Sequence, residues 1–235
     1  MRRTVAVFGA GSGTGASVAR RFGREGHRVA LVARRRDPLD KLVARLAADG
    51  VEAAAFPADL RHTERIPALV SAIEARFGHI DVAVYAPFVP ATLIPAAAVD
   101  AAVLRAWLDL YLLSPVALAH TLLPGMLERG DGALLFGYGS SVVTPAAGLS
   151  GPVPVLAALR NYLHTLHGEV ADRGVHVGGL AVRAVIERSE GHRALRSGDM
   201  SLAIDLPTVD PDELADLVWN LVTQRDRIEV VHPAP

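Results

Sequence analysis

The chain has 235 residues, 51% of them hydrophobic, which is enough for one α/β domain with a sizeable buried core. A net charge of −1 gives no electrostatic reason to expect nucleic acid or a membrane surface as a partner. The absence of cysteine excludes disulfides, thiolate catalysis and cysteine metal sites. No run approaches the roughly 18 apolar residues of a membrane helix, and the stretch before Gly9 is too short for a signal peptide, so we expect a cytoplasmic protein.

The first predicted elements are a strand, a glycine-rich turn and a helix. Apolar residues 5–8 lead into Gly9-Ala10-Gly11-Ser12-Gly13-Thr14-Gly15, and a helical pattern follows over 16–22. Glycines allow the backbone to approach a pyrophosphate closely, and free N–H groups at a helix N-terminus attract anions. Because this glycine-rich turn lies between a strand and a helix, it indicates a dinucleotide site rather than a flexible loop without a ligand.

Strand and helix patterns alternate along the rest of the chain. Apolar runs predict strands at 28–33, 51–56, 82–85, 133–136, 175–182 and 228–231. Helical patterns cover 37–49, 63–77, 100–129, 153–173 and 210–223, and we expect Pro115 and Pro124 to interrupt the third of these. Residues 187–206 show no clear periodicity, and we expect an irregular segment there that covers the substrate.

This alternation predicts one domain over residues 1–235. The fold is a Rossmann-type, doubly wound parallel sheet of about seven strands with helices on both faces. Ligands of such sheets bind beyond the carboxyl ends of the strands, so residues after the first five strands should line one crevice.

Arg34 and Arg35 follow the second predicted strand, where the choice between NAD and NADP is made. An acidic residue there bonds the ribose 2′-hydroxyl of NAD, whereas an arginine accommodates the 2′-phosphate of NADP. The guanidinium fork suits a phosphate group. We therefore expect NADP(H) as the cofactor; the alternative is a solvated basic turn.

The motifs resemble those of the short-chain dehydrogenase/reductase family. Gly9, Gly13 and Gly15 match its G-x-x-x-G-x-G turn, and the likeness continues over 80–84, 132–136, 157–162 and 175–177. The resemblance spans nearly the whole chain. It implies that Asp59, followed by Leu60, bonds the adenine amino group, although Asp59 alternatively caps the next helix.

The family's Asn-Asn-Ala-Gly after the fourth strand is replaced here by Tyr85-Ala86-Pro87-Phe88. The ribose contact that the resemblance implies is therefore altered, and we expect the backbone carbonyl of Ala86 to serve in it.

The catalytic half departs from the family pattern, which uses Ser, Tyr and Lys with a helper Asn. The Tyr-x-x-x-Lys positions hold Pro152 and Leu156, and Tyr111 occupies the asparagine position. The serine position is Gly139 or Ser140, depending on a one-residue register. The family's Pro-Gly and threonine after the sixth strand are Val182-Arg183 and Glu187. The single lysine, Lys41, lies in the second helix, so no displaced lysine restores the usual pair.

A replacement proton donor is sought in the same crevice. We expect Ser140, Tyr138 and Tyr111 to be the catalytic candidates, with Tyr138 first because it neighbours Ser140 at the end of the fifth strand. An unassisted phenol with a pKa near 10 is a weak acid, and the alternative for each tyrosine is a packed aromatic ring with a satisfied hydroxyl. His164 and His167 are expected at a helix interface, and no spacing suggests a metal site.

Three functions remain open at this point. The first is an NADP(H)-dependent oxidoreductase that reduces a carbonyl of a mostly apolar small molecule with a non-standard proton donor. The second is a non-redox cyclase, dehydratase or isomerase on the same scaffold, and the third is a non-catalytic binding or partner subunit. The resemblance also implies a homodimer or homotetramer, built on helical stripes that include Trp107, Leu112 and Leu163.

Overall fold

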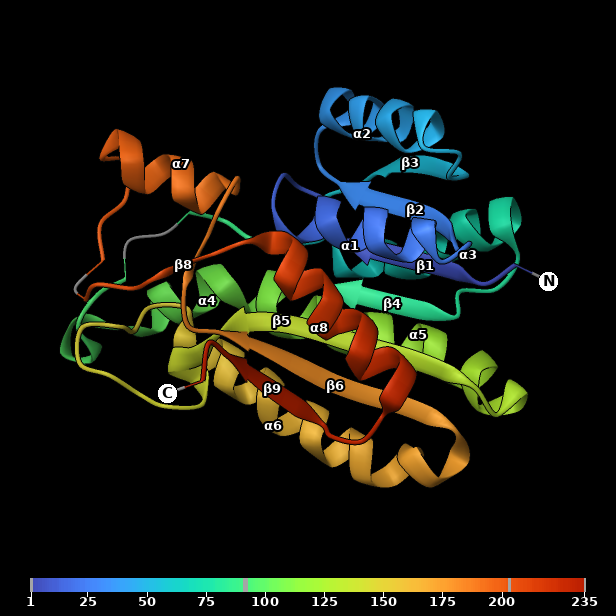
Figure 1. Ribbon diagram of the computed structural model, residues 1–235. Helices are drawn as coiled ribbons and strands as arrows, with labels where there is room; N and C mark the ends of the chain where they lie inside the picture. The colour runs from blue at the N-terminus through green and yellow to red at the C-terminus, as the bar shows by residue number, and fades with distance from the viewer. Residues whose placement is uncertain (1, 91–92, 203, 235) are drawn as a thin grey trace.

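A computed structural model describes residues 2–90, 93–202 and 204–234, and it contains a seven-stranded parallel sheet (Figure 1). The strand order is β3-β2-β1-β4-β5-β6-β9. The strands are β1 (Thr4–Phe8), β2 (Arg28–Ala33), β3 (Ala53–Pro57), β4 (Val82–Tyr85), β5 (Gly132–Gly139), β6 (Val175–Val182) and β9 (Glu229–His232). The order reverses direction between β1 and β4, so the predicted Rossmann-type fold is confirmed.

Helices cover both faces of the sheet. One face carries α1 (Thr14–Arg24), α2 (Arg36–Ala48) and α8 (Pro211–Gln224), and the other carries α3 (Ile66–Phe77), α5 (Ser114–Arg129) and α6 (Val153–Val170). Successive strand residues point to opposite faces, so each strand supplies both cores. In β1, for example, Val5 and Val7 pack under α1, whereas Ala6 and Phe8 face the α3–α5 side.

The helical region 101–129 is continuous, which differs from the expected interruption at two prolines. It consists of α4 (Ala101–Leu108), a π-helical turn η3 (Asp109–Leu113) and α5. Pro115 lies in the first turn of α5, just after the π-helical turn, where its missing N–H group disturbs no regular hydrogen bond. Pro124 lies inside α5 and costs only the bond to the carbonyl of His120, an exposed residue. The π-helical turn, which is the irregular part of this helical region, thus lies before Pro115.

This helical run, Ala101–Arg129, is long and apolar enough to pass a composition test for a membrane-crossing helix. Several of its side chains, among them Leu118, Leu122 and Met126, are buried against the sheet. Core helices pass the same test, so length and composition do not place the run in a membrane.

The segment 187–206 was expected to be irregular, and this was wrong for its first half. It contains α7 (Glu190–Ser197), with Ser189 as N-cap and Gly198 in the left-handed conformation after its last turn. The Ser189 side chain accepts a hydrogen bond from the backbone N–H of His192. A two-stranded parallel pair, β7 (Val185–Ile186) and β8 (Thr208–Val209), holds the base of the segment. An eight-residue helix shows too little apolar periodicity to be recognised without its caps.

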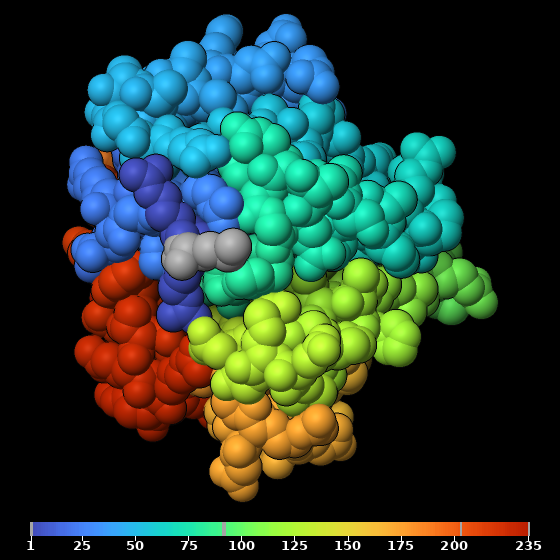
Figure 2. Space-filling model, turned by 90° about the vertical axis from the view of Figure 1, so that its right-hand side faces the viewer, coloured from blue at the N-terminus to red at the C-terminus, as the bar shows by residue number. Residues whose placement is uncertain are grey.

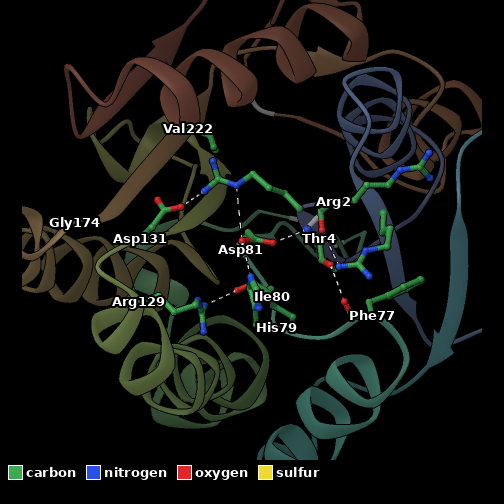
Figure 3. A network of polar contacts seen from close by, with 12 residues as sticks. Arg2, Thr4, Phe77, His79, Ile80, Asp81, Arg129, Asp131, Gly174 and Val222 are labelled. Carbon is green, nitrogen blue, oxygen red and sulfur yellow. Dashed lines mark hydrogen bonds and ion pairs between the residues drawn. The ribbon is translucent and has the colours of Figure 1, made fainter.

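A polar network joins the amino ends of the strands, opposite the predicted site (Figure 3). The Thr4 N–H donates to Asp81 Oδ2 at 2.6 Å, and His79 Nε2 lies 3.1 Å from Asp81 Oδ1. Asp131 pairs with Arg3 and with Arg225. Figure 2 looks onto this edge and shows the first residues (dark blue) between α8 (red) and α3 (cyan-green). These bonds tie β1, β4 and β5 together and leave the opposite edge free for ligands.

Candidate nucleotide-binding and active site

The glycine turn between β1 and α1 has a steric requirement at three of its four glycines. Gly9 and Gly13 have φ angles of +97° and +108°. A Cβ on Gly9 would lie 2.6 Å from the backbone of Pro87, and one on Gly15 would lie 2.5 Å from the Gly9 carbonyl oxygen. A Cβ on Gly11 would meet nothing closer than 4.0 Å. The packing therefore requires glycine at the three positions of the G-x-x-x-G-x-G frame and leaves room for a side chain at Gly11.

The turn leaves hydrogen-bonding groups free for an anion. Within the described residues, the N–H groups of Thr14 and Gly15 have no protein acceptor, as is usual in the first turn of a helix. The Thr14 hydroxyl is buried and has no partner in this part of the chain. These donors lie at the positive end of the α1 dipole. The turn thus fits phosphate groups by shape, by charge and by hydrogen-bonding capacity.

Arg34 and Arg35 lie in the turn between β2 and α2 but have different partners. Arg35 Nη2 lies 2.8 Å from Glu190 Oε1 of α7, and Arg36 pairs with Asp40. Arg34 is exposed, and no ion pair with it occurs among the described residues. Its charge contributes to the lowered pKa of Asp59 and opposes the rise in the pKa of Tyr111 that burial causes, so Arg34 lies on the side of the sheet that holds both residues. Arg34 is therefore the guanidinium available to a phosphate.

Asp59 and Leu60 follow β3, as expected for an adenine contact. Arg61 binds the Asp59 carboxylate through its Nε at 3.1 Å and through its backbone N–H at 3.0 Å, and this lowers the pKa of Asp59 to about 2. The carboxylate forms this local pair and does not cap a helix. Leu60 is buried, and its carbonyl accepts the Ser114 hydroxyl. Ala86, after β4, donates its N–H to the Phe8 carbonyl at 2.9 Å.

Tyr138 lies inside the protein under α6. Its hydroxyl donates to Glu229 Oε1 at 2.6 Å, and Arg160 binds the same carboxylate at 2.7 and 2.9 Å. Burial and the Glu229 charge raise the pKa of Tyr138 far above its ordinary value. The ring lies over Gly179, where any Cβ would overlap the hydroxyl. This geometry supports the alternative of a packed aromatic ring with a satisfied hydroxyl.

Tyr111 lies in η3 and points toward the segment after β4. Its hydroxyl accepts the Val89 N–H at 3.3 Å, and its ring stacks on Trp107 at 5.6 Å between centroids. Burial raises the pKa of Tyr111 to about 12, so the hydroxyl keeps its proton at neutral pH. Tyr85, by contrast, donates to the Leu110 carbonyl at 2.6 Å within the core.

Ser140 begins the 3₁₀ turn η4 (Ser140–Val142), and Pro152 is the N-cap residue of α6. Both η3 and η4 pack against α6, so Tyr111, Ser140, Pro152 and Leu156 belong to one corner of the crevice. Leu156 packs into the core at the position where the family places its lysine. Tyr111 and Ser140 thus bring hydroxyl groups to this corner, and Leu156, which the resemblance aligns with the family's lysine, brings no charge.

The segments over this corner are apolar and touch one another. Ser150 donates its N–H to the Ile94 carbonyl at 3.0 Å, which joins the segments after β4 and β5. Phe88 reaches α7, where a Cβ on Gly191 would lie 3.0 Å from its ring. Leu149 is buried beneath them. Phe88, Ile94 and Leu149 therefore form an apolar roof on this side of the expected crevice.

His167 and His176 pack against each other between α6 and β6. His167 Nδ1 lies 2.8 Å from the Val177 carbonyl oxygen, and its ring meets His176 edge to face. Sequence reasoning missed His176, which is only 2% exposed and whose pKa burial lowers to about 4. No group of three or more metal-ligating side chains occurs in residues 2–90, 93–202 and 204–234.

Comparison with known proteins agrees with this geometry. The family model described as short chain dehydrogenase matches residues 3–186. A fatty acyl-CoA reductase of Mycobacterium tuberculosis is 34% identical over 186 residues, which cover 74% of this chain and 60% of that protein. Another fatty acyl-CoA reductase, from Acinetobacter baylyi, is 26% identical over 96% of this chain and 75% of its own length.

Among solved structures, a metagenomic short-chain oxidoreductase in complex with NADP is 26% identical, with a TM-score of 0.79 over 98% of this chain and 97% of that one. An actinorhodin polyketide ketoreductase with NADPH shares the fold, with a TM-score of 0.83 at 24% identity over 98% of this chain and 97% of its own. The chain belongs to the short-chain dehydrogenase/reductase family.

Proposed function

We propose that this protein binds NADP(H) at the carboxyl edge of its sheet and reduces a carbonyl group of a mostly apolar molecule, with a proton route that differs from the family's tyrosine and lysine. The steric requirement at Gly9, Gly13 and Gly15 carries the proposal, because it preserves a phosphate-sized cradle at the N-terminus of α1. Arg34 supports the phosphorylated form of the cofactor, since it has no acidic partner among the described residues.

One group of residues would bind the cofactor, and a second group would act on the substrate carbonyl. The glycine turn with Ser12 and Thr14 would hold the pyrophosphate, Arg34 the 2′-phosphate, and Asp59, Leu60 and Ala86 the adenosine. When bound, the nicotinamide supplies the hydride for carbonyl reduction. NADP-bound relatives on the same fold support this assignment. The chain's own residues then have to orient the carbonyl and provide a proton.

Ser140 and Tyr111 are the hydroxyl groups best placed for that task. Tyr111 remains protonated because its pKa is raised to about 12, so it donates a hydrogen bond but releases its proton reluctantly. We assign both residues to orienting and polarising the carbonyl, with water as the final proton source. We assign a structural role to Tyr138, because its hydroxyl donates a hydrogen bond to the Glu229 carboxylate.

The apolar roof over the crevice favours a carbon-rich substrate. Phe88, Leu149 and Ile94 contribute to it, and two similar proteins are named fatty acyl-CoA reductases. We therefore propose long-chain aldehydes and acyl thioesters as the first substrates to test. We also propose a cytoplasmic homodimer or homotetramer, in which the exposed Leu113 joins the interface; Leu163, expected in such an interface, is buried inside the protomer.

The test follows the near-ultraviolet absorbance of NADPH in the presence of these carbonyl compounds. We expect carbonyl-dependent oxidation of NADPH, with kcat reduced about 100-fold in Ser140→Ala and nucleotide affinity unchanged, because one polarising hydrogen bond is lost. Tyr138→Phe serves as the matched control and should retain activity. Product formation without NADPH consumption would refute the redox proposal.

That last outcome would favour the second candidate, a non-redox cyclase, dehydratase or isomerase. The observation on its side is the pair Pro152 and Leu156, which supplies neither a proton nor a positive charge at the family's catalytic positions. If no carbonyl compound is converted although NADPH binds, the third candidate, a non-catalytic binding subunit, is favoured instead.

A further inference from the structure

Helix α7 crosses the phosphate cradle and touches both of its walls. On the glycine turn, Arg193 Nη2 donates to Ser12 Oγ at 2.9 Å. Ser189 packs against the same turn, since a Cβ on Gly13 would lie 3.0 Å from the Ser189 Cβ. On the other wall, Glu190 pairs with Arg35 at 2.8 Å. Residues 190 and 193 lie one turn apart on a helix, so a single turn of α7 connects the glycine turn with the turn between β2 and α2.

The Arg193 guanidinium is fixed at this point without a compensating negative charge. Its Nη1 donates to the Arg188 carbonyl at 3.1 Å, which orients the group toward Ser12. Arg188 itself pairs with Asp210 and Asp212, which anchors the base of α7 to α8. In the part of the chain that the structure describes, Arg193 forms no ion pair with a carboxylate. A guanidinium hydrogen-bonded to a phosphate-binding turn is therefore left available for an anion.

The Arg193 guanidinium adds a positive charge to a region that already holds other positive groups. The N-terminus of α1 carries the positive end of a helix dipole, and Arg34 is the exposed cation on the opposite wall. The Thr14 hydroxyl, buried without a partner in the described residues, lies two positions from Ser12. An anionic group bound at the glycine turn would therefore meet the free N–H groups of Thr14 and Gly15 beside the Arg193 guanidinium, and dinucleotide phosphates are such groups.

We propose that Arg193 is a further cofactor-binding residue, delivered by α7, whose guanidinium contacts a phosphate of NADP(H) beside Ser12. The inference rests on the proposed nucleotide site. It makes α7 part of the nucleotide site as well as a cover for the substrate. It also explains why the N-terminal turn of this helix carries Glu190 and Arg193 on the side that faces the groove.

The test compares Arg193→Ala, Arg193→Lys and wild type by calorimetric titration with NADPH, NADH, 2′,5′-ADP and ADP. Arg196→Ala is the matched control, because Arg196 is an exposed arginine on the same helix. We expect Arg193→Ala to weaken NADPH binding about tenfold, the loss of one hydrogen bond to a charged group, and the lysine variant to recover part of it. Circular dichroism checks that the variants are folded.

The ligand set identifies the phosphate. Parallel weakening of all four ligands assigns Arg193 to the 5′-phosphates, and weakening confined to NADPH and 2′,5′-ADP assigns it to the 2′-phosphate; either result supports the proposal. Affinities within twofold of wild type for every ligand would overturn it while leaving the nucleotide site intact. If wild type itself binds none of the four, the proposed function fails together with the inference.

Discussion

The glycine turn allows a sharp contrast between Gly15→Ala and Gly11→Ala. A Cβ on Gly15 would lie 2.5 Å from the Gly9 carbonyl oxygen and 2.9 Å from Ala10 Cα, both in the backbone. Relief requires α1 to move by about an ångström from β1, and overpacking of this kind costs about 2–3 kcal/mol of unfolding free energy. At Gly11 the nearest atom is 4.0 Å away and φ is not in the left-handed region. Alanine there restricts the unfolded chain and should stabilise by about 0.5 kcal/mol.

Urea unfolding measures the stability of both variants, and NADPH titration measures the site. We expect Gly15→Ala to be destabilised and to bind NADPH at least tenfold more weakly, because the free N–H groups of Thr14 and Gly15 move with the helix. Gly11→Ala should be slightly more stable than wild type, by about 0.5 kcal/mol, and should bind NADPH with wild-type affinity. Equal losses in the two variants, or a neutral Gly15→Ala, would refute the steric argument for the G-x-x-x-G-x-G frame.

Three further variants test other contacts. Tyr138→Phe should lower the unfolding free energy by about 1–2 kcal/mol, because the hydrogen bond to Glu229 is lost, and it should leave turnover unchanged. A large loss of kcat in a variant of wild-type stability would show that Tyr138 takes part in catalysis. The pKa of His176 is about 4 in the folded protein and 6.5 in the unfolded chain. The contribution of the neutral His176 side chain to the free energy of unfolding is therefore fully present above pH 6.5, and it is lost as the pH falls toward 4. Wild type should lose about 2 kcal/mol more than His176→Gln between pH 7 and pH 5, and identical pH dependence in urea unfolding would contradict this. Glu190→Gln should release Arg35 and tighten NADPH binding about twofold, while the affinity for NADH stays unchanged. Stability should change little, because the ion pair is exposed. Weaker NADPH binding would show that the ion pair supports the nucleotide site.

The elements that build the sheet could be predicted because their signals are local. Val82–Tyr85 is a continuous apolar run, Val175–Val182 is apolar apart from His176 and two glycines, and both strands have the predicted bounds. The glycine turn was identified from its position between a strand and a helix. These features depend on neighbouring residues, so the order of the chain is enough to find them.

The partners of individual side chains could not be predicted in the same way. Tyr138 was favoured as a proton donor because Ser140 is close in sequence, but its hydroxyl meets Glu229, which lies 91 residues away. The contact of Arg193 with Ser12 spans 181 residues and depends on a short helix that periodicity did not reveal. Both contacts arise from the stacking of distant elements on one sheet.

The most direct test of the nucleotide site is a fluorescence titration of wild type and Arg34→Ala with NADPH and with NADH. We expect wild type to bind NADPH more tightly than NADH, and Arg34→Ala to lose about tenfold or more in NADPH affinity while NADH affinity changes little, because only NADPH carries the 2′-phosphate. Failure of wild type to bind either nucleotide would contradict the proposal that this chain retains a working cofactor site.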